Sequence, residues 1–200
     1  MPLTMAGFLV YLIGPSGSGK DSLLSAAAGP LAAMGARIAT RVITRPTGSI
    51  GEEQAIGLGI EAFRERSERG EFALCWHANQ LSYAIPREID DWLAEGRTVL
   101  VNGSRGHLQE ARRRYPTLLP ILLHVEEAVL RQRLLHRGRE NPQQVEARLQ
   151  RSRQMQSELA AEPDLHLLDN SGALEASVSR LLALIVEHSR ATAADGCPDA

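Results

Sequence analysis

The sequence predicts an α/β fold, a three-layer sandwich in which helices cover both faces of a parallel five-stranded core sheet. Short apolar runs of strand length alternate with longer segments of helical periodicity along the 200 residues, as in chains whose parallel strands are joined by helices. The run at residues 8–13 is apolar at every position, as expected for a strand that is buried on both faces. A chain of this length suits one domain that carries inserted segments.

Each element of this fold is expected at a definite place in the chain. The strands of the sheet are expected at residues 8–13, 37–43, 98–102, 118–125 and 165–168. Helices are expected at residues 21–34, 61–70, 86–95, 108–115, 126–137, 143–158 and 172–188. Gly35 is expected to end the first helix, whereas Pro30 counts against its last turn. Residues 44–60 are rich in glycine and are expected to form a loop, and residues 72–83 have a mixed pattern compatible with extended chain.

No linker or internal repeat divides the pattern, so residues 7–189 are interpreted as a single domain. Two segments are interpreted as additions to its core: an inserted region at about 44–96 and a short lid at about 131–148. Residues 190–200 have little apolar surface to bury and are expected to be disordered.

The composition argues against several classes of function. A net charge of −2 gives no bulk attraction to nucleic acid or membrane, and 4% aromatic residues are too few for a base-stacking surface. No apolar run reaches the ~18 residues that span a bilayer, and the N-terminus lacks a signal-peptide pattern, so a cytoplasmic protein is expected. Cys75 and Cys197 are far apart and the six histidines are scattered, which predicts neither a disulfide nor a zinc site.

A glycine-rich segment between the first expected strand and helix is the strongest functional signal. It matches the phosphate-binding pattern GxxxxGK: Gly14, Pro15, Ser16, Gly17, Ser18, Gly19 and Lys20. Backbone N–H groups of such a loop turn toward phosphate oxygens, and the helix that follows adds the positive end of its dipole. Lys20 is the only lysine among 22 basic residues, so this chain uses a slim ammonium only here, where a planar guanidinium would be too wide. The segment predicts a P-loop NTPase that binds ATP.

The residues after the loop lysine depart from the usual pattern, in which Ser or Thr ligates Mg²⁺. Here Asp21 follows Lys20, and Ser22 comes next. Asp21 could hold Mg²⁺ directly or through water, or it could point away and only favour the helix N-terminus. The strand at 98–102 ends in Asn102 without an acidic neighbour, which favours Asp21 as the metal-binding carboxylate. Residues 14–22 are therefore expected to bind the nucleotide and its Mg²⁺.

Longer motifs make the chain resemble the guanylate kinase group over about residues 8–188. The matches are GPSGSGKDS in the loop, Thr44-Arg45, Trp76 with Tyr83, the lid pattern of Leu130, Arg133, Leu134, Arg137 and Gly138, and Arg148-Leu149. The resemblance implies the P-loop kinase fold, with the insertion at about 44–96 as the acceptor-binding region. It also implies that Lys20, together with Arg133, Arg137 and Arg148 from the lid, carries the phosphoryl transfer.

Three departures concern the groups that read guanine in that group. Arg41 stands where a serine is usual, Cys75 where a glutamate is usual, and the segment 102–105 lacks the usual acidic residue. Guanidinium groups such as Arg41 and Arg105 suit a second phosphate instead.

One branch of the group is more similar. Residues 76–79 (WHAN), 99–105 (VLVNGSR) and 137–141 (RGREN) resemble the ribose 1,5-bisphosphate phosphokinases of bacterial phosphonate utilisation. The resemblance implies ATP-dependent phosphorylation of ribose 1,5-bisphosphate to 5-phosphoribosyl 1-diphosphate. It implies a sugar phosphate as the partner, with neither nucleic acid nor membrane, and it leaves open a homodimer.

The expected acceptor site contains Arg41, Arg45, His77, Asn79, Tyr83, Asn102 and Arg105. Several of the expected site residues have a simpler alternative: the lid residues Arg133 and Arg137, four apart on a helix, could form a solvated face, His77 could be structural, and Tyr83 could fill the core. Three other functions remain as alternatives. These are a guanylate or other nucleoside monophosphate kinase, an inactive protein-binding module, and a regulatory nucleotide switch, of which the last two leave the loop lysine or the lid arginines unexplained.

Overall fold

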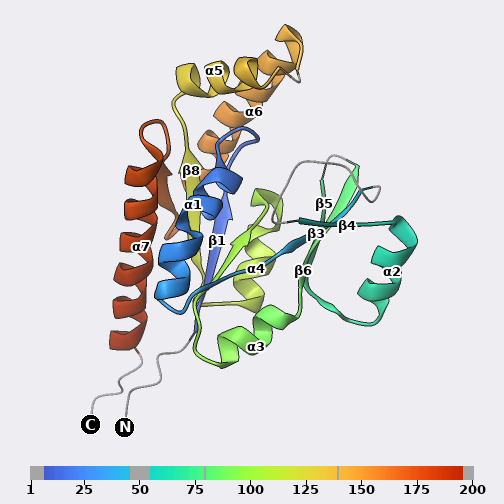
Figure 1. Ribbon diagram of the computed structural model, residues 1–200, viewed down its shortest axis with the longest axis vertical. Coiled ribbons are helices and arrows are strands. Elements are labelled where there is room, and N and C mark those ends of the chain that lie inside the picture. The colour runs from blue at the N-terminus through green and yellow to red at the C-terminus, as the bar shows by residue number, and fades with distance from the viewer. Residues whose placement is uncertain (1–6, 46–54, 79, 139, 196–200) are drawn as a thin grey trace.

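The computed structural model describes residues 7–45, 55–78, 80–138 and 140–195 (Figure 1). Its central sheet contains five parallel strands in the order β2-β7-β1-β8-β9. They are β1 (Leu9–Ile13), β2 (Arg37–Ile38), β7 (Val99–Asn102), β8 (Leu119–His124) and β9 (His166–Asp169). The predicted α/β fold with a parallel five-stranded sheet is therefore confirmed.

Two helical layers bury the two faces of this sheet. Val10 and Leu12 face α1 (Lys20–Ala33) and α7 (Leu174–Asp195), whereas Leu9, Tyr11 and Ile13 face the opposite side. That side is covered by α3 (Glu88–Ala94), α4 (Leu108–Arg114) and the end of α6 (Pro142–Leu159). Every residue of β1 is buried, which explains why its sequence is apolar throughout. In the part of the chain that the structure describes, no helix is long and apolar enough to cross a membrane.

A second sheet, which the sequence did not predict, forms beside the first (Figure 1). Its order is β4-β3-β6-β5: β3 (Arg41–Thr44), β4 (Ala55–Leu58), β5 (Phe72–Ala78) and β6 (Leu81–Pro86), with α2 (Ile60–Glu68) alongside. The expected strand at 37–43 is divided, because β2 pairs with β7 for two residues and the chain then crosses to pair with β4 and β6. The expected loop at 44–60 contains β4, and the helix expected from residue 86 begins at Glu88.

The end of helix α1 agrees with the expected helix at 21–34 to within one residue, whereas the end of α7 differs from expectation. Helix α1 continues past Pro30 to Ala33, because fully buried Leu31 holds the last turn against the core. Helix α7 continues to Asp195, so residues 190–195 are helical rather than disordered, and the rest of the expected tail lies outside the described residues.

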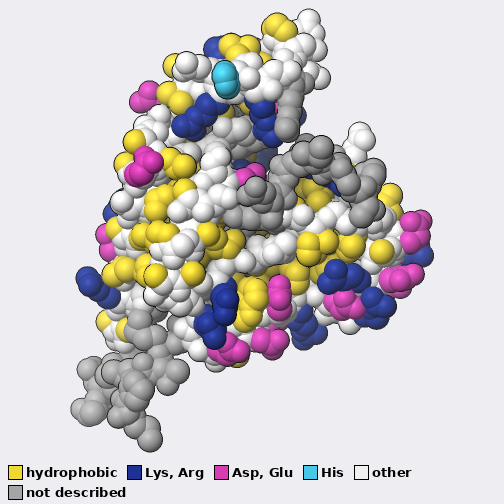
Figure 2. All heavy atoms as spheres, viewed as in Figure 1, with side chains coloured by type: hydrophobic (Ala, Val, Ile, Leu, Met, Phe, Trp, Pro, Cys, Tyr) yellow, Lys and Arg dark blue, Asp and Glu magenta, His cyan; other side chains and the backbone are white. Residues whose placement is uncertain are grey.

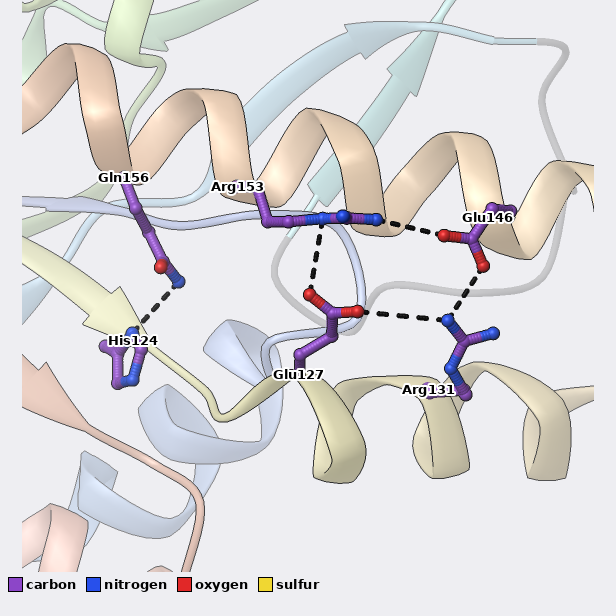
Figure 3. Close-up of polar contacts among 6 residues, drawn as sticks. All are labelled: His124, Glu127, Arg131, Glu146, Arg153 and Gln156. Carbon is purple, nitrogen blue, oxygen red and sulfur yellow. Dashed lines mark hydrogen bonds and ion pairs between the residues drawn. The ribbon is translucent and has the colours of Figure 1, made fainter.

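The segment expected to form a lid, at about 131–148, lies within α5 (Glu127–Arg137) and α6, and we call these two helices the lid. They pack together through a small apolar core of their own. Figure 3 shows a closed ring of alternating charges between them. Arg131 bridges Glu127 (3.8 Å) and Glu146 (2.7 Å), and Arg153 bridges the same two carboxylates at 3.3 and 2.9 Å. Exposed ion pairs contribute little singly, so the buried leucines and valines of this core are the main reason the two helices form one body.

The loop after β7 is held by the side chain of Tyr11. The phenol hydroxyl donates to the carbonyl oxygen of Ser104 and accepts from its N–H, both at 3.0 Å. Burial raises the pKa of Tyr11 to about 12, so the hydroxyl stays protonated and remains a donor at neutral pH. Gly103 crosses the ring so closely that a Cβ at this position would lie 2.3 Å from Tyr11 Cζ.

Gly103→Ala is therefore expected to lower the free energy of unfolding by about 1–3 kcal/mol, because a fully buried ring has no space to move away. Thermal unfolding should show a Tm lower by about 2–4 °C for each kcal/mol lost. Gly106→Ala is the matched control, since a Cβ there meets no atom within 4 Å. Equal melting temperatures for the two variants would contradict the prediction.

Candidate active site

A cleft of about 1460 Å³ opens at the carboxyl ends of the parallel strands, where α/β folds of this kind bind ligands. The glycine loop, the ends of β1 and β7, the second sheet and the lid all contribute to its walls. Figure 2 shows arginine side chains gathered on the lid beside the hollow that separates it from the rest of the molecule. The cleft exceeds the roughly 300–1,000 Å³ of a typical small-molecule site, so it has room for two ligands.

Most of the site residues expected from the sequence line this one cleft. They are Gly14, Pro15, Ser16, Gly17, Gly19, Lys20, Asp21, Ser22, Arg41, Arg45, Tyr83, Asn102, Arg105, Arg133, Arg137 and Arg148. Ser18 is fully buried beneath the loop. These residues come from six separate stretches of the chain (14–22, 41–45, 83, 102–105, 133–137 and 148), and only the fold brings them together.

The glycine loop has the backbone conformation of a phosphate cradle. Gly17 and Gly19 both have φ of 88°, in the left-handed region that glycine adopts without strain. The ammonium of Lys20 donates to the carbonyl oxygens of Gly14 (2.7 Å) and Pro15 (3.2 Å), which folds the side chain over the loop. Helix α1 begins at this lysine, so its N-terminal N–H groups point into the same space.

Two lid arginines contact the loop directly. Arg133 donates from Nη1 to the carbonyl oxygen of Ser18 (3.5 Å) and from Nη2 to that of Asn170 (2.8 Å). Arg148 donates to the hydroxyl of Ser16 and forms an ion pair with Glu140 at 2.9 Å. Both guanidinium groups therefore lie beside the cradle. The third lid arginine, Arg137, lines the cleft from the exposed end of α5.

The expected metal site joins two elements of the core. The side-chain amide of Asn102, at the end of β7, donates from Nδ2 to Oδ1 of Asp21 at 3.1 Å. Asn102 is buried, and among the described residues its Oδ1 has no hydrogen-bond partner. A carboxylate beside an amide oxygen is a donor set that suits a hard cation such as Mg²⁺. Among the described residues, at this site or at any other, no group of three His, Cys, Asp or Glu side chains could hold a metal ion.

The opposite wall of the cleft is formed by an aromatic stack. The rings of Tyr83 and Trp76 are parallel within 6°, with centroids 5.6 Å apart. The guanidinium of Arg41 lies 5.4 Å from the centre of the Tyr83 ring, a cation–π contact that orients its charge toward the cleft. Arg45 follows β3 and lines the cleft beside them. This wall combines an apolar platform with two positive charges.

Two of the expected acceptor residues, His77 and Arg105, have another placement or another partner. His77 is exposed, accepts or donates a 2.9 Å hydrogen bond with Ser82, and does not line the cleft that the described residues form. Its neighbours Trp76 and Ala78 do line it, because successive residues of a strand point to opposite faces. Arg105 lines the cleft but is paired with Glu158 of α6 at 2.5 Å. Asn79 lies outside the described residues.

Cys75 likewise does not line the cleft within the described structure, and it is exposed on the same face of β5 as His77. The cysteine at this position, where a glutamate is usual, is therefore weak evidence about which acceptor the cleft binds. The arginine at position 41, where a serine is usual, is stronger evidence, because Arg41 lines the cleft.

Two functional candidates were missed by sequence reasoning. Asn170, just after β9, is 2% exposed and donates from Nδ2 to the carbonyl oxygen of Ser18 at 2.7 Å, while its own carbonyl accepts from Arg133. Glu140 holds Arg148. The position of Asn170 at the carboxyl end of a predicted strand could have indicated it, whereas nothing local connects Glu140 with Arg148.

Comparison with known proteins places this site in a family, although no protein-family model matches the chain. A Pseudomonas fluorescens (strain SBW25) protein named ribose 1,5-bisphosphate phosphokinase PhnN is 58% identical over 180 residues, which cover 89% of this chain and 94% of that protein. A protein of the same name from Pseudomonas paraeruginosa (strain DSM 24068 / PA7) is 55% identical over 179 residues, which cover 90% of this chain and 95% of that protein. A guanylate kinase from Anaplasma phagocytophilum has a similar fold, with a TM-score of 0.67, 16% identity, and 92% and 87% covered. With a P-loop cleft and this similarity along nearly its whole length, the chain belongs to the ribose 1,5-bisphosphate phosphokinase PhnN family.

Proposed function

We propose that this protein transfers the γ-phosphoryl group of ATP to ribose 1,5-bisphosphate, forming 5-phosphoribosyl 1-diphosphate and ADP. The reaction would be one step of phosphonate catabolism. The observation that carries the proposal is a single cleft with a phosphate cradle at one wall, Arg41 and Arg45 at the other, and lid arginines between them. This arrangement supplies positive charge for two polyanionic ligands at once. The family named for this reaction supports the choice of acceptor.

The chemistry requires little from the protein beyond position and charge. An oxygen of the acceptor's 1-phosphate attacks the γ-phosphorus, and the bond from that phosphorus to the β–γ bridging oxygen breaks, so that ADP leaves. The attacking oxygen is already anionic and needs no general base. The barrier then lies in bringing two polyanions into line, which oriented cations and N–H donors lower.

The donor side of the site is assigned to the loop and the lid. Backbone N–H groups of residues 16–20 hold the β-phosphate, and Lys20 follows the γ-phosphoryl group toward the acceptor. Arg133, Arg137 and Arg148 cover the transferring group and exclude water as the lid closes. The contacts of Arg133 and Arg148 with the loop support this assignment, because they place both guanidinium groups beside the cradle.

Mg²⁺ is assigned to Asp21, whose exposed carboxylate lines the cleft beside Ser22. When bound, the ion would neutralise charge on the β- and γ-phosphate oxygens.

The acceptor side is assigned to Arg41 and Arg45 for the phosphate groups and to Tyr83 for the ribose. Guanidinium groups bind phosphate through two hydrogen bonds at once, and the stacked ring of Tyr83 offers a flat apolar surface for the sugar. Asn102 and Arg105 line the cleft between the two sides.

The first test is ADP release from ATP and Mg²⁺ with either ribose 1,5-bisphosphate or GMP as acceptor. We expect turnover with the sugar bisphosphate and kcat/KM lower by at least about 10³-fold with GMP, because Arg41 and Arg45 are half-buried donors that offer no acceptor to the N–H groups of guanine. Turnover with GMP alone would instead make the protein a guanylate kinase.

Variants of the acceptor wall extend this test. Arg41→Met and Arg45→Met should each lower kcat/KM for ribose 1,5-bisphosphate by about 10–100-fold, the effect of losing a charge-assisted hydrogen bond. Arg64→Met is the control, since that side chain is 72% exposed on α2 and outside the cleft.

A further inference from the structure

Asp21 and Asn102 are 81 positions apart in the sequence, yet their side chains are hydrogen-bonded in the cleft. In P-loop NTPases, Mg²⁺ is held by a hydroxyl group directly after the loop lysine and by an acidic residue near the end of a neighbouring strand. In this chain the loop position carries the acid, Asp21, and the end of β7 carries the neutral residue, Asn102. Compared with the usual arrangement, the negative charge is therefore on the helix instead of at the end of the strand.

The hydrogen bonding of Asn102 indicates that this residue has a role in ligand binding as well as in packing at the end of β7. Its Nδ2 donates to Asp21, so its Oδ1 is the oxygen that remains to accept. The residue is only 7% exposed, and its Oδ1 has no partner in the described part of the chain. Leaving a buried acceptor without a hydrogen bond costs stability unless a ligand satisfies it. Both side chains line the cleft next to the phosphate cradle.

We propose that Asp21 and Asn102 form one exchanged Mg²⁺ site, in which each residue does what the other position usually does. Asp21 supplies the carboxylate. Asn102 fixes the orientation of that carboxylate through Nδ2 and directs Oδ1 toward the cation or a water of its shell. Nucleotide phosphates supply other oxygen ligands, so the inference rests on the proposed function for the presence of the nucleotide.

The competing interpretation is that Asp21 only favours the N-terminus of α1, where any acidic side chain is stabilising. That interpretation gives Asn102 no part in metal binding. It also predicts that a carboxylate moved to position 102 cannot replace the one at position 21. A variant that exchanges the two residues therefore separates the interpretations, because Asp21→Asn with Asn102→Asp keeps the hydrogen-bonding groups and the net charge.

The experiment measures Mn²⁺ binding to the ADP complex by electron paramagnetic resonance, with Mn²⁺ in place of Mg²⁺. Asp21→Asn and Asn102→Ala should each weaken Mn²⁺ binding by about 10–100-fold. The double variant D21N/N102D should recover at least about tenfold of the loss shown by D21N. Wild-type Mn²⁺ affinity in both single variants, or a double variant that binds no better than D21N, would overturn the proposal.

Two controls keep the result interpretable. ADP affinity in the presence of EDTA reports whether each variant keeps its phosphate cradle, and thermal unfolding reports whether it is folded. The metal titration uses no acceptor. A protein that binds Mn²⁺·ADP through this pair but does not phosphorylate ribose 1,5-bisphosphate would therefore retain the metal site and lose only the proposed function.

Discussion

Replacing Lys20 with methionine is expected to lower kcat by about 10³-fold, the upper part of the range for removing one preorganised electrostatic group. The ammonium is the only mobile cation supplied by the glycine loop, and its contact with the Gly14 carbonyl places it over the cradle. The measurement is ADP release at saturating ATP and acceptor, so that kcat is separated from KM.

Two further measurements distinguish a role of Lys20 in catalysis from a role in holding the loop: the activity of Lys20→Arg, and the thermal stability and nucleotide affinity of Lys20→Met. Lys20→Arg keeps the charge but is expected to recover little activity, because a planar guanidinium does not fit between the phosphates. This outcome would explain why a chain with 21 arginines has its one lysine here. If Lys20 mainly braces the loop through Gly14 and Pro15, the methionine variant should instead lose thermal stability together with nucleotide affinity.

Replacing Arg148 with methionine is expected to lower kcat by about 10³-fold, the lower end of the range for arginines that stabilise a transferring phosphoryl group. The side chain reaches from α6 to the hydroxyl of Ser16 and is held by the carboxylate of Glu140, which is only 7% exposed. A guanidinium held in place before the reaction loses little entropy as charge develops. Steady-state kinetics that vary both substrates provide the measurement.

Arg131→Met is the matched control for the lid. Arg131 is an arginine of similar exposure in α5, but it belongs to the charged ring of Figure 3 and does not line the cleft formed by the described residues. Its loss should leave kcat within about twofold and cost at most about 1 kcal/mol of stability, as for other exposed ion pairs. Similar kinetic losses in R148M and R131M would show that lid integrity matters rather than Arg148 itself.

The sequence alone determined the core of this fold and one wall of its site. The continuous apolar run that became β1, the glycine loop and the start of α1 are contiguous in the chain, so local pattern and spacing were enough to place them. The parallel direction of the strands followed from the alternation of strands and helices, whereas their order in the sheet did not. The lid arginines were predicted from the resemblance to kinases, since the spacing of Arg133 and Arg137 by itself also fits a solvated face, and both residues line the cleft.

Tertiary structure decided the features that depend on partners distant in the sequence. Strand β3 belongs to a second sheet because Val42 pairs with Ala84, and no local signal separates it from β2. The packing of β5 decides which of its two faces borders the cleft. Trp76 is on that face and lines the cleft, whereas His77 is on the other face and is exposed. Folding also pairs Asp21 with Asn102 and Glu140 with Arg148. Periodicity specifies which residues share a face, but only the packed chain decides which faces meet.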